Sequence, residues 1–132
     1  MYEIRAIGYV ESPVTDPGSA PMQGFEGAPD AWLVFYPEVA EAARDLTAGT
    51  EVYVLTWLHL AQRDVLVVHP RSDPNNPLTG VFSTRSPDRP NPIGLHRVRI
   101  TAVDGLRVLV RDLEAIDGTP IVDVKPVLEG GR

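Results

Sequence analysis

The chain has 132 residues, no cysteine and a net charge of −6. This length suits one domain with a single core, which we expect to span residues 1–132, and the lack of cysteine excludes disulfide bonds and thiolate metal sites. No basic flank followed by an apolar run opens the sequence, and no uncharged apolar stretch approaches the ~20 residues of a membrane span. We therefore expect a cytoplasmic protein without a membrane segment, and we expect residues 127–132 to be frayed.

The first part of the chain is expected to form two strands separated by a long loop, and then a helix. Alternation predicts a strand over residues 2–12, and an apolar run predicts a second over 31–36. Four prolines and three glycines exclude regular structure in residues 13–29, and so long a loop in a small domain is more often functional than idle. A helix is predicted over 37–49, since Pro37 suits the first helical position and Gly49 follows the expected stop.

The rest of the chain is expected to be strands. β-Branched and aromatic residues predict strands over 50–60 and 64–70, and a short strand is expected around 80–83. Residues 95–103 and 106–116 form a predicted hairpin around Asp104-Gly105, and 121–125 form the last strand. About seven strands and one helix, without a βαβ rhythm, predict a mainly β fold, a small closed antiparallel β-barrel with one helix.

The central segment GVFSTRSPDRPNPIGL, residues 80–95, is rigid and polar. Its three prolines fix φ and restrict the residue before each, while Gly94 permits a close approach of the backbone. Residues 84–99 carry four arginines and one aspartate, a net charge of +3, so the other residues sum to −9. We interpret the segment as a preorganised anion clamp in which Arg89 and Asn91 bind the substrate. The alternative is a rigid corner between strands, with its arginines solvated or paired to nearby acids.

Two further groups of polar residues could bind a metal or take part in catalysis. The three histidines are dispersed without the short spacings of metal ligands, so we expect no metal site, and His59 is expected at the edge of the core. In AIDGTPIVDVKP, Asp117 begins a tight turn, and Asp123 and Lys125 share one face of the last strand. These two side chains could form a structural ion pair, or Asp123 could orient or deprotonate an amine-type nucleophile, and both interpretations stay open.

Three stretches of the chain, IGYVESP, GVFSTRSPDRPNPIGL and LEAIDGTPIVDVKP, occur in the order seen in the TsaA-like (TrmO) family. The resemblance covers the chain from about residue 7 to residue 126 and matches the N-terminal barrel domain of that family. It implies a small β-barrel with a crossover helix and a homodimer that binds S-adenosylmethionine (SAM) near the subunit interface without a Rossmann sheet. It also implies transfer of a methyl group to N6 of threonylcarbamoyladenosine at tRNA position 37.

The resemblance implies site residues in five parts of the chain. The implied SAM contacts are Pro21, Met22 and Gln23 in the long loop, His59 and Leu60 at a strand end, Arg85 and Leu95 in the central segment, and Glu114, Ala115, Ile116 and Asp117 before the Gly-Thr-Pro turn. Asp123 and Lys125 match polar positions at the reacting end and are implied to be catalytic, with Asp123 taking the proton of the acceptor nitrogen.

Three departures from the family bear on the acceptor. Met22 stands where the family usually has arginine, Val127 replaces an aromatic residue, and the bacterial tRNA enzymes continue into a C-terminal domain that this sequence, ending at Arg132, is expected to lack. A SAM-dependent methyltransferase acting on a small molecule and a non-catalytic SAM-binding module therefore stay open. An oligonucleotide-binding barrel is less supported, because its aromatic platform would need residues that we expect in the core, namely Trp32, Phe35, Tyr53 and Trp57.

Overall fold

The computed structural model describes residues 1–15 and 30–130, and these are mainly β. The strands are β1 (Gly8–Glu11), β2 (Ala31–Phe35), β3 (Glu51–Trp57), β4 (Val67–Val68), β5 (Thr79–Gly80), β6 (Ile93–Asp104), β7 (Arg107–Arg111) and β8 (Pro120–Pro126). The helical elements are α1 (Ala40–Ala43) and the 3-10 turns η3 (Pro37–Val39), η4 (Pro70–Ser72) and η5 (Val81–Ser83). The prediction of a mainly β fold with one α-helix is confirmed. No helix in these ranges is long and apolar enough to cross a membrane.

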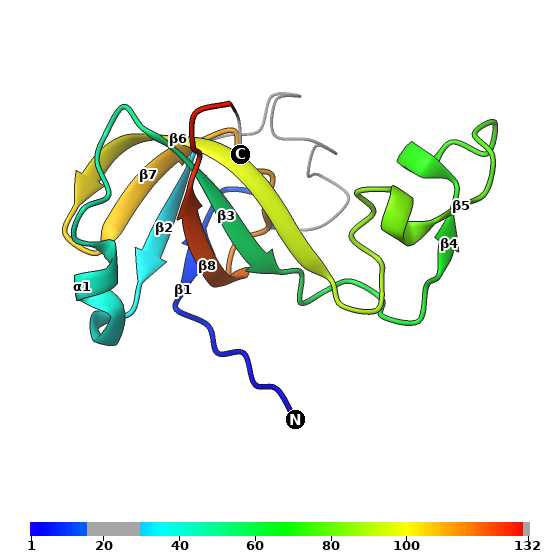
Figure 1. The fold of residues 1–132 in the computed structure, drawn as a ribbon, viewed down its shortest axis with the longest axis horizontal. Helices are drawn as coiled ribbons and strands as arrows, with labels where there is room; N and C mark the ends of the chain where they lie inside the picture. The colour runs from blue at the N-terminus through cyan, green and yellow to red at the C-terminus, as the bar shows by residue number, and fades with distance from the viewer. Residues whose placement is uncertain (16–29, 131–132) are drawn as a thin grey trace.

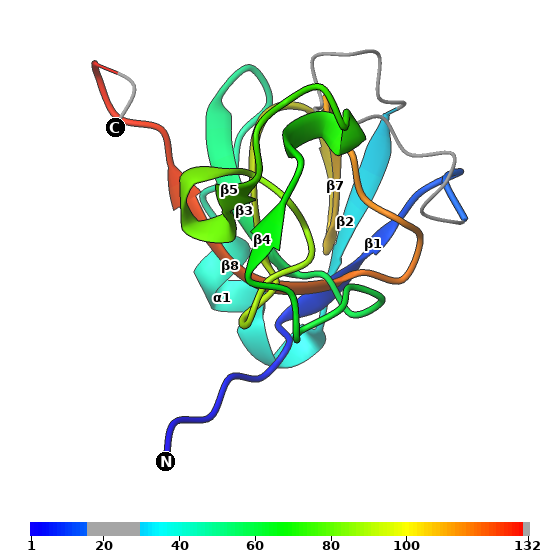
Figure 2. The same cartoon turned by 90° about the vertical axis from the view of Figure 1, so that its right-hand side faces the viewer.

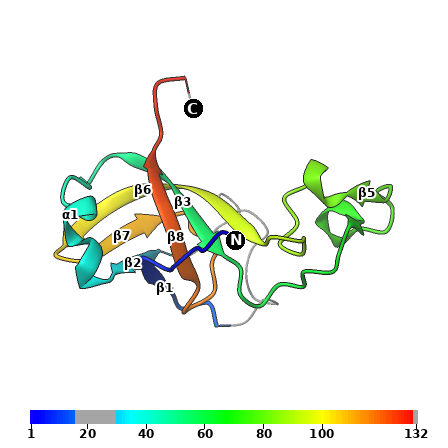
Figure 3. The same cartoon turned by 60° about the horizontal axis from the view of Figure 1, so that its bottom comes forward.

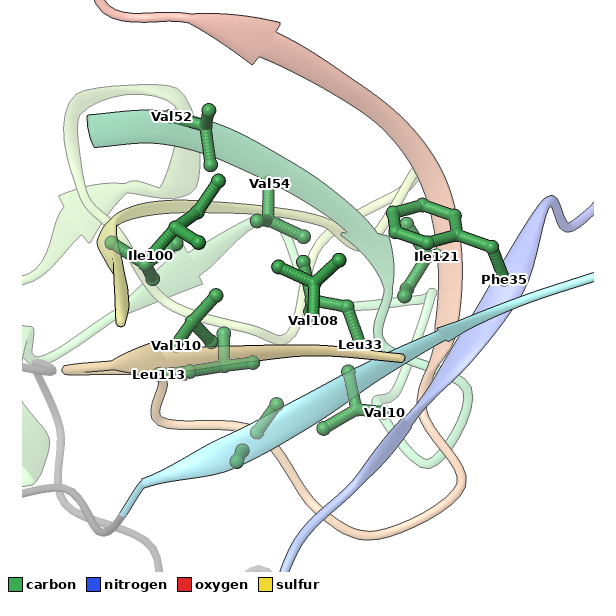
Figure 4. Close-up of a cluster of buried hydrophobic side chains, with 13 residues drawn as sticks. Val10, Leu33, Phe35, Val52, Val54, Ile100, Val108, Val110, Leu113 and Ile121 are labelled. Carbon is green, nitrogen blue, oxygen red and sulfur yellow. The ribbon is translucent and has the colours of Figure 1, made fainter. Parts of the chain in front are cut away.

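Six strands form one antiparallel sheet in the order β1-β2-β7-β6-β3-β8, and β1 also pairs with β8, so the sheet closes on itself (Figure 1). Along β3 and β6 every second side chain is buried, which is the period of a strand with one face inward. The inward valines, leucines and isoleucines meet in a single core, seen in Figure 4. Helix α1 lies at one end of the barrel.

Residues 58–92, which we call the arm, leave the barrel after Trp57 and return at Ile93. These two residues are directly paired, and the Leu58 amide donates to the Pro92 carbonyl at 2.8 Å, so the arm has a closed base. Figures 1 and 3 show the arm projecting sideways from the barrel, with the small β4-β5 sheet at its far end, and Figure 2 looks at it end-on.

Several predicted boundaries were wrong, each for a local reason. The predicted helix over 37–49 is an η3 turn and one α turn ending at Ala43, because the Thr47 hydroxyl and the Leu46 amide bond to nearby carbonyls and compete with the helix. The strand expected over 2–12 begins only at Gly8, since its partner β2 ends opposite at Phe35. The strand over 106–116 ends at Arg111, because Asp112 has a φ of 69°.

The two strands expected in the arm were also shortened. Of 64–70 only Val67–Val68 is a strand, since Pro70 begins a 3-10 turn and the partner β5 has two residues. Of 80–83 only Gly80 belongs to a strand, and Val81–Ser83 form η5, whose carbonyl at Val81 accepts hydrogen bonds from the Thr84 amide and from Arg89.

Candidate functional site

The end of the barrel that carries the arm gathers most of the predicted site residues that the structure describes. β3 ends there, β6 and β8 begin there, and the loop from Asp112 to Thr119 returns from β7 to this end. Thr56 pairs with Gly94 on one side and with Ile121 on the other, which places three strands of the sheet at this level. The site is therefore assembled from strand ends and from the loop between β7 and β8.

A chain of polar side chains enters the barrel at this end. His96 is 4 % exposed and lies on the inner face of β6. Its Nδ1 lies 2.7 Å from Glu114 Oε1, and its Nε2 lies 2.7 Å from the hydroxyl of the fully buried Thr56. The other oxygen of Glu114 has no hydrogen-bond partner among the described residues. Within the described part of the chain, Glu114 is thus anchored through one of its two oxygens.

The turn around Asp117 is tied to the first strand. The Ser12 amide donates to Asp117 Oδ1 at 2.9 Å, the Asp117 amide donates to the Val14 carbonyl at 2.7 Å, and the Gly118 amide donates to the Val10 carbonyl at 2.7 Å. Ala115 is buried in the core, whereas Glu114, Ile116 and Asp117 keep exposed surface. These hydrogen bonds fix the backbone at the end of the predicted SAM-contacting run, residues 114–117, against residues 10–14.

The outer face of the barrel brings Leu95 and Asp123 into one row. Leu55 pairs with Leu95 on β6 and with Asp123 on β8, so the two outer residues lie about 10 Å apart, two strand spacings. Asp123 Oδ2 lies 3.2 Å from the Lys125 ammonium, and Oδ1 accepts the Val124 amide at 2.9 Å. The structural ion pair thus exists. Both side chains are about half exposed, so the pair contributes little to stability, and a catalytic role for them stays a prediction.

Arg89 makes its hydrogen bonds within the arm. Its guanidinium donates to the carbonyls of Ser86, Val81 and Thr84, which folds residues 81–86 around it. The predicted role in substrate binding is untested. These bonds show that Arg89 also organises the loop that carries Arg85.

Asn91 is held by a residue that the sequence reasoning did not single out. Arg63 donates to Asn91 Oδ1 at 2.9 Å and to the Pro90 carbonyl at 2.7 Å, and its guanidinium lies 5.1 Å from the centre of the Trp57 ring. Such a cation–π contact stabilises by roughly 0.5–1 kcal/mol at an exposed site. Arg63 therefore ties the returning end of the arm to the end of β3. No sequence motif marks it.

The arginines of the basic segment differ in their partners. Arg97 and Arg99 flank Glu51 on the outer face, and the hydrogen bond from Arg97, with the charge of both guanidinium groups, holds the Glu51 pKa below its ordinary value. The same contact raises the pKa of Arg97. Arg85 is exposed and has no hydrogen bond or ion pair with another described residue. Of these arginines, Arg85 is the one whose guanidinium is available to an anion.

The remaining predicted site residues lie in two other stretches of the chain, 59–60 and 21–23. His59 and Leu60 are exposed at the base of the arm, so the expectation of His59 at the core edge was wrong. Pro21, Met22 and Gln23 lie outside the described residues. No group of three or more potential metal ligands occurs within residues 1–15 and 30–130.

The predicted core aromatic residues and a hollow in the described surface lie outside these groups of residues. Of the four aromatic residues expected in the core only Phe35 belongs to it, and Trp32, Tyr53 and Trp57 are half-buried on the outer face. A hollow of about 630 Å³ lies at the barrel end away from the arm, between the start of β3 and residues 126–130, and none of the predicted site residues lines it. The predicted site residues of the described ranges therefore lie elsewhere than this hollow.

Comparison with known proteins identifies the family. A model of the tRNA-methyltransferase O N-terminal domain matches residues 9–130. The chain belongs to the TrmO N-terminal domain family. The resemblance noted in the sequence is thereby confirmed.

Relatives of this TrmO-family protein include a "Probable S-adenosyl-L-methionine-binding protein" of Methanothermobacter thermautotrophicus. The two sequences are 42 % identical over 126 residues, which cover 96 % of this chain and 90 % of the relative. An "S-adenosyl-L-methionine-binding protein" of Archaeoglobus fulgidus is 38 % identical and covers 92 % and 86 %. The crystal structure of TrmO from Pseudomonas aeruginosa matches with a TM-score of 0.76 and 28 % identity over 97 % of this chain. The chain spans 56 % of that TrmO structure.

Proposed function

We propose that the protein binds SAM and is a SAM-dependent N-methyltransferase of the TrmO type, which methylates N6 of threonylcarbamoyladenosine at tRNA position 37. The observation that carries the proposal is the Glu114 carboxylate, fixed through one oxygen inside the barrel and without a partner on the other among residues 1–15 and 30–130. It stands on an anchored turn in a chain whose relatives are named as SAM-binding proteins.

The described residues fit the chemical parts of SAM. A carboxylate with one free oxygen suits the ribose hydroxyls or the sulfonium cation, and Glu114 supplies it. A planar guanidinium suits the amino-acid carboxylate of the donor or a carboxylate of the acceptor, and Arg85, which has no partner in the described ranges, supplies it. Leu60 and Leu95 are 57 % and 42 % exposed and offer apolar surface to the adenine ring.

When bound, SAM supplies a methyl group that passes in line to the acceptor nitrogen as the carbon–sulfur bond breaks. The protein accelerates such a displacement mainly by aligning the two reactants. We assign Asp123 to take the proton that the nitrogen loses, directly or through a water molecule. Lys125 and the Val124 amide hold the Asp123 carboxylate in place. We assign Arg89 and Asn91 to the acceptor side of the site.

We further propose that the protein is a homodimer with SAM near the subunit interface. The far end of the arm exposes the apolar side chains Leu66, Val67, Leu78 and Phe82, whose exposed fractions run from 56 % to 84 %. All four residues lie in or next to β4, β5 and η5, and exposed apolar side chains gathered in one region indicate an interaction site. A second chain against the arm would also cover the open site surface. Sedimentation velocity should show a dimer for the wild type and a shift towards monomer for Phe82→Ser, and a wild-type monomer at all concentrations would refute this part.

A small-molecule acceptor is the second candidate, and the charge distribution favours it. The chain carries −6 overall, and Arg97 and Arg99 are paired with Glu51, so the described part offers few free cations to an RNA backbone. A non-catalytic SAM-binding module would share the donor site and differ in showing no transfer.

Titration calorimetry with SAM and with its demethylated product tests the donor site directly. A labelled-methyl assay on total tRNA, before and after removal of the threonylcarbamoyl group, tests the acceptor, and the label should enter only the untreated tRNA. Label in a metabolite fraction instead would favour the small-molecule reading, and binding without any transfer would favour the module. Absence of SAM binding at millimolar concentration would refute the donor site.

A further inference from the structure

We infer that His96 is a positioning residue for Glu114 and through it for the methyl donor, an inference that rests on the proposed function. His96 does not need to touch the ligand to act in this way, because it lies inside the barrel with a side chain 3 % exposed, whereas that of Glu114 is 17 % exposed. It links the interior of the fold to the carboxylate at the rim.

The hydrogen bonds along this chain have one consistent direction. A carboxylate only accepts, so the ring nitrogen Nδ1 of His96 carries the proton and donates it to Glu114 Oε1. In the tautomer with this single proton on Nδ1, Nε2 accepts the hydroxyl hydrogen of Thr56. Both distances are 2.7 Å, at the short end of the range for such bonds. Glu114 therefore selects the tautomer with the proton on Nδ1, and the Thr56 hydroxyl, which can donate, holds the opposite side of the ring.

The surroundings hold the imidazole ring in this orientation. Val54 is the paired neighbour of His96 on β3, and Val98 is the next inward residue of β6, so the ring stands among buried apolar side chains. A side chain at Gly94 would come within 2.7 Å of Nε2, so the glycine keeps the space that the ring occupies. Glu114 is the one charged group that contacts the ring among residues 1–15 and 30–130.

The consequence for the ligand is preorganisation. An unrestrained glutamate side chain at a rim would have to give up rotamer freedom on binding, at roughly 0.5–1.5 kcal/mol for a side chain of this kind. His96 removes that freedom in the unliganded protein by holding Oε1, so that Oε2 meets the ligand at a defined place. Loss of the hydrogen bond from Nδ1 should therefore weaken donor binding by up to about tenfold.

Two substitutions of His96 separate positioning from packing. The side-chain amide of His96→Asn falls near Nδ1 and can still donate to Glu114, whereas that of His96→Gln falls near Nε2 and can reach Thr56 instead. We expect the dissociation constant for SAM, measured by calorimetry, to stay within about twofold of wild type in His96→Asn and to rise about tenfold in His96→Gln. Thermal unfolding should give the opposite order of stability, because glutamine fills more of the space of the ring.

The outcomes distinguish the inference from the proposed function. One outcome is that the wild type binds SAM while the two variants bind it equally well, or while their affinities follow the order of their thermal stabilities. Either result overturns the role of His96 and leaves the donor site standing. If the wild type does not bind SAM, both fall. Should either His96 variant fail to fold, Thr56→Val and Thr56→Ser give the same test. The valine variant lacks the hydroxyl and should bind SAM about threefold more weakly than the serine variant, and equal binding would overturn the inference.

Discussion

Replacement of Gly94 by alanine tests whether the interior of the barrel is packed around the polar chain. Gly94 lies on the inner face of β6, and an added methyl group would come within 2.7 Å of His96 Nε2 and even closer to the Thr56 hydroxyl. Overpacking a core costs about 1–3 kcal/mol. Separating Thr56 from His96 leaves buried polar atoms without a partner, at about 1–3 kcal/mol. Because the two effects share one displacement, we expect a total loss of about 2–4 kcal/mol in the free energy of unfolding.

Gly80→Ala is the matched control for this substitution. A methyl group at Gly80 meets nothing within 4 Å, and its φ is −58°, which alanine adopts without strain. Urea unfolding should therefore give a clearly lower midpoint for Gly94→Ala with an unchanged slope, and a midpoint near that of the wild type for Gly80→Ala. Equal midpoints for the two variants would show that the barrel interior accommodates a methyl group at position 94, and the description of a packed polar chain would be wrong.

Three further predictions concern single side chains. Asp123→Asn should slow methyl transfer far more than it weakens SAM binding, and wild-type turnover would remove Asp123 from the mechanism. Arg85→Ala should weaken SAM or acceptor binding about tenfold and leave the unfolding midpoint unchanged, because the guanidinium has no partner among the described residues. The lowered pKa of Glu51 means that its stabilising effect is present above its ordinary value of 4.5 and is lost as the pH falls below it, so Glu51→Gln should show a flatter acid-unfolding profile, and an identical profile would contradict this.

The strands of the barrel could be predicted from the sequence because each is an alternating or apolar run bounded by turn residues. The hairpin of β6 and β7 is the clearest case, since Asp104-Gly105 fits a two-residue turn and Gly105 has a φ of 60°. The helix is shorter than predicted, because Pro37 and Gly49 indicate where a helix can begin and end but not which hydrogen bonds compete with it. The Thr47 hydroxyl donates to the Asp45 carbonyl, and the Thr50 hydroxyl donates to the Thr47 carbonyl. A residue pattern gives little information about whether such side-chain hydrogen bonds form in place of helical ones.

The polar interior was the main feature of the site that the sequence reasoning missed. His96 was set aside as one of three dispersed histidines, although it occupies an inward position of the alternating run that continues through Val98 and Ile100. That period alone could have placed it inside the barrel. Its partners Thr56 and Glu114 are 40 and 18 residues away in the chain, and only the closure of the sheet brings them together.

The central segment combines rigidity with an available cation, and the sequence pattern predicts the two together as one clamp. Its rigidity comes partly from its prolines and partly from bonds that the sequence does not reveal, in which the Asp88 carboxylate accepts the Gln62 amide and Arg89 wraps the preceding carbonyls. These bonds engage most of the polar groups that had suggested a clamp. Arg85 has no partner in the part of the chain that the structure describes, and its loop is itself held by these bonds. A cation on a fixed loop loses less entropy on binding an anion than one on a flexible loop. We therefore interpret the rigidity of the arm as a means of fixing the position of Arg85.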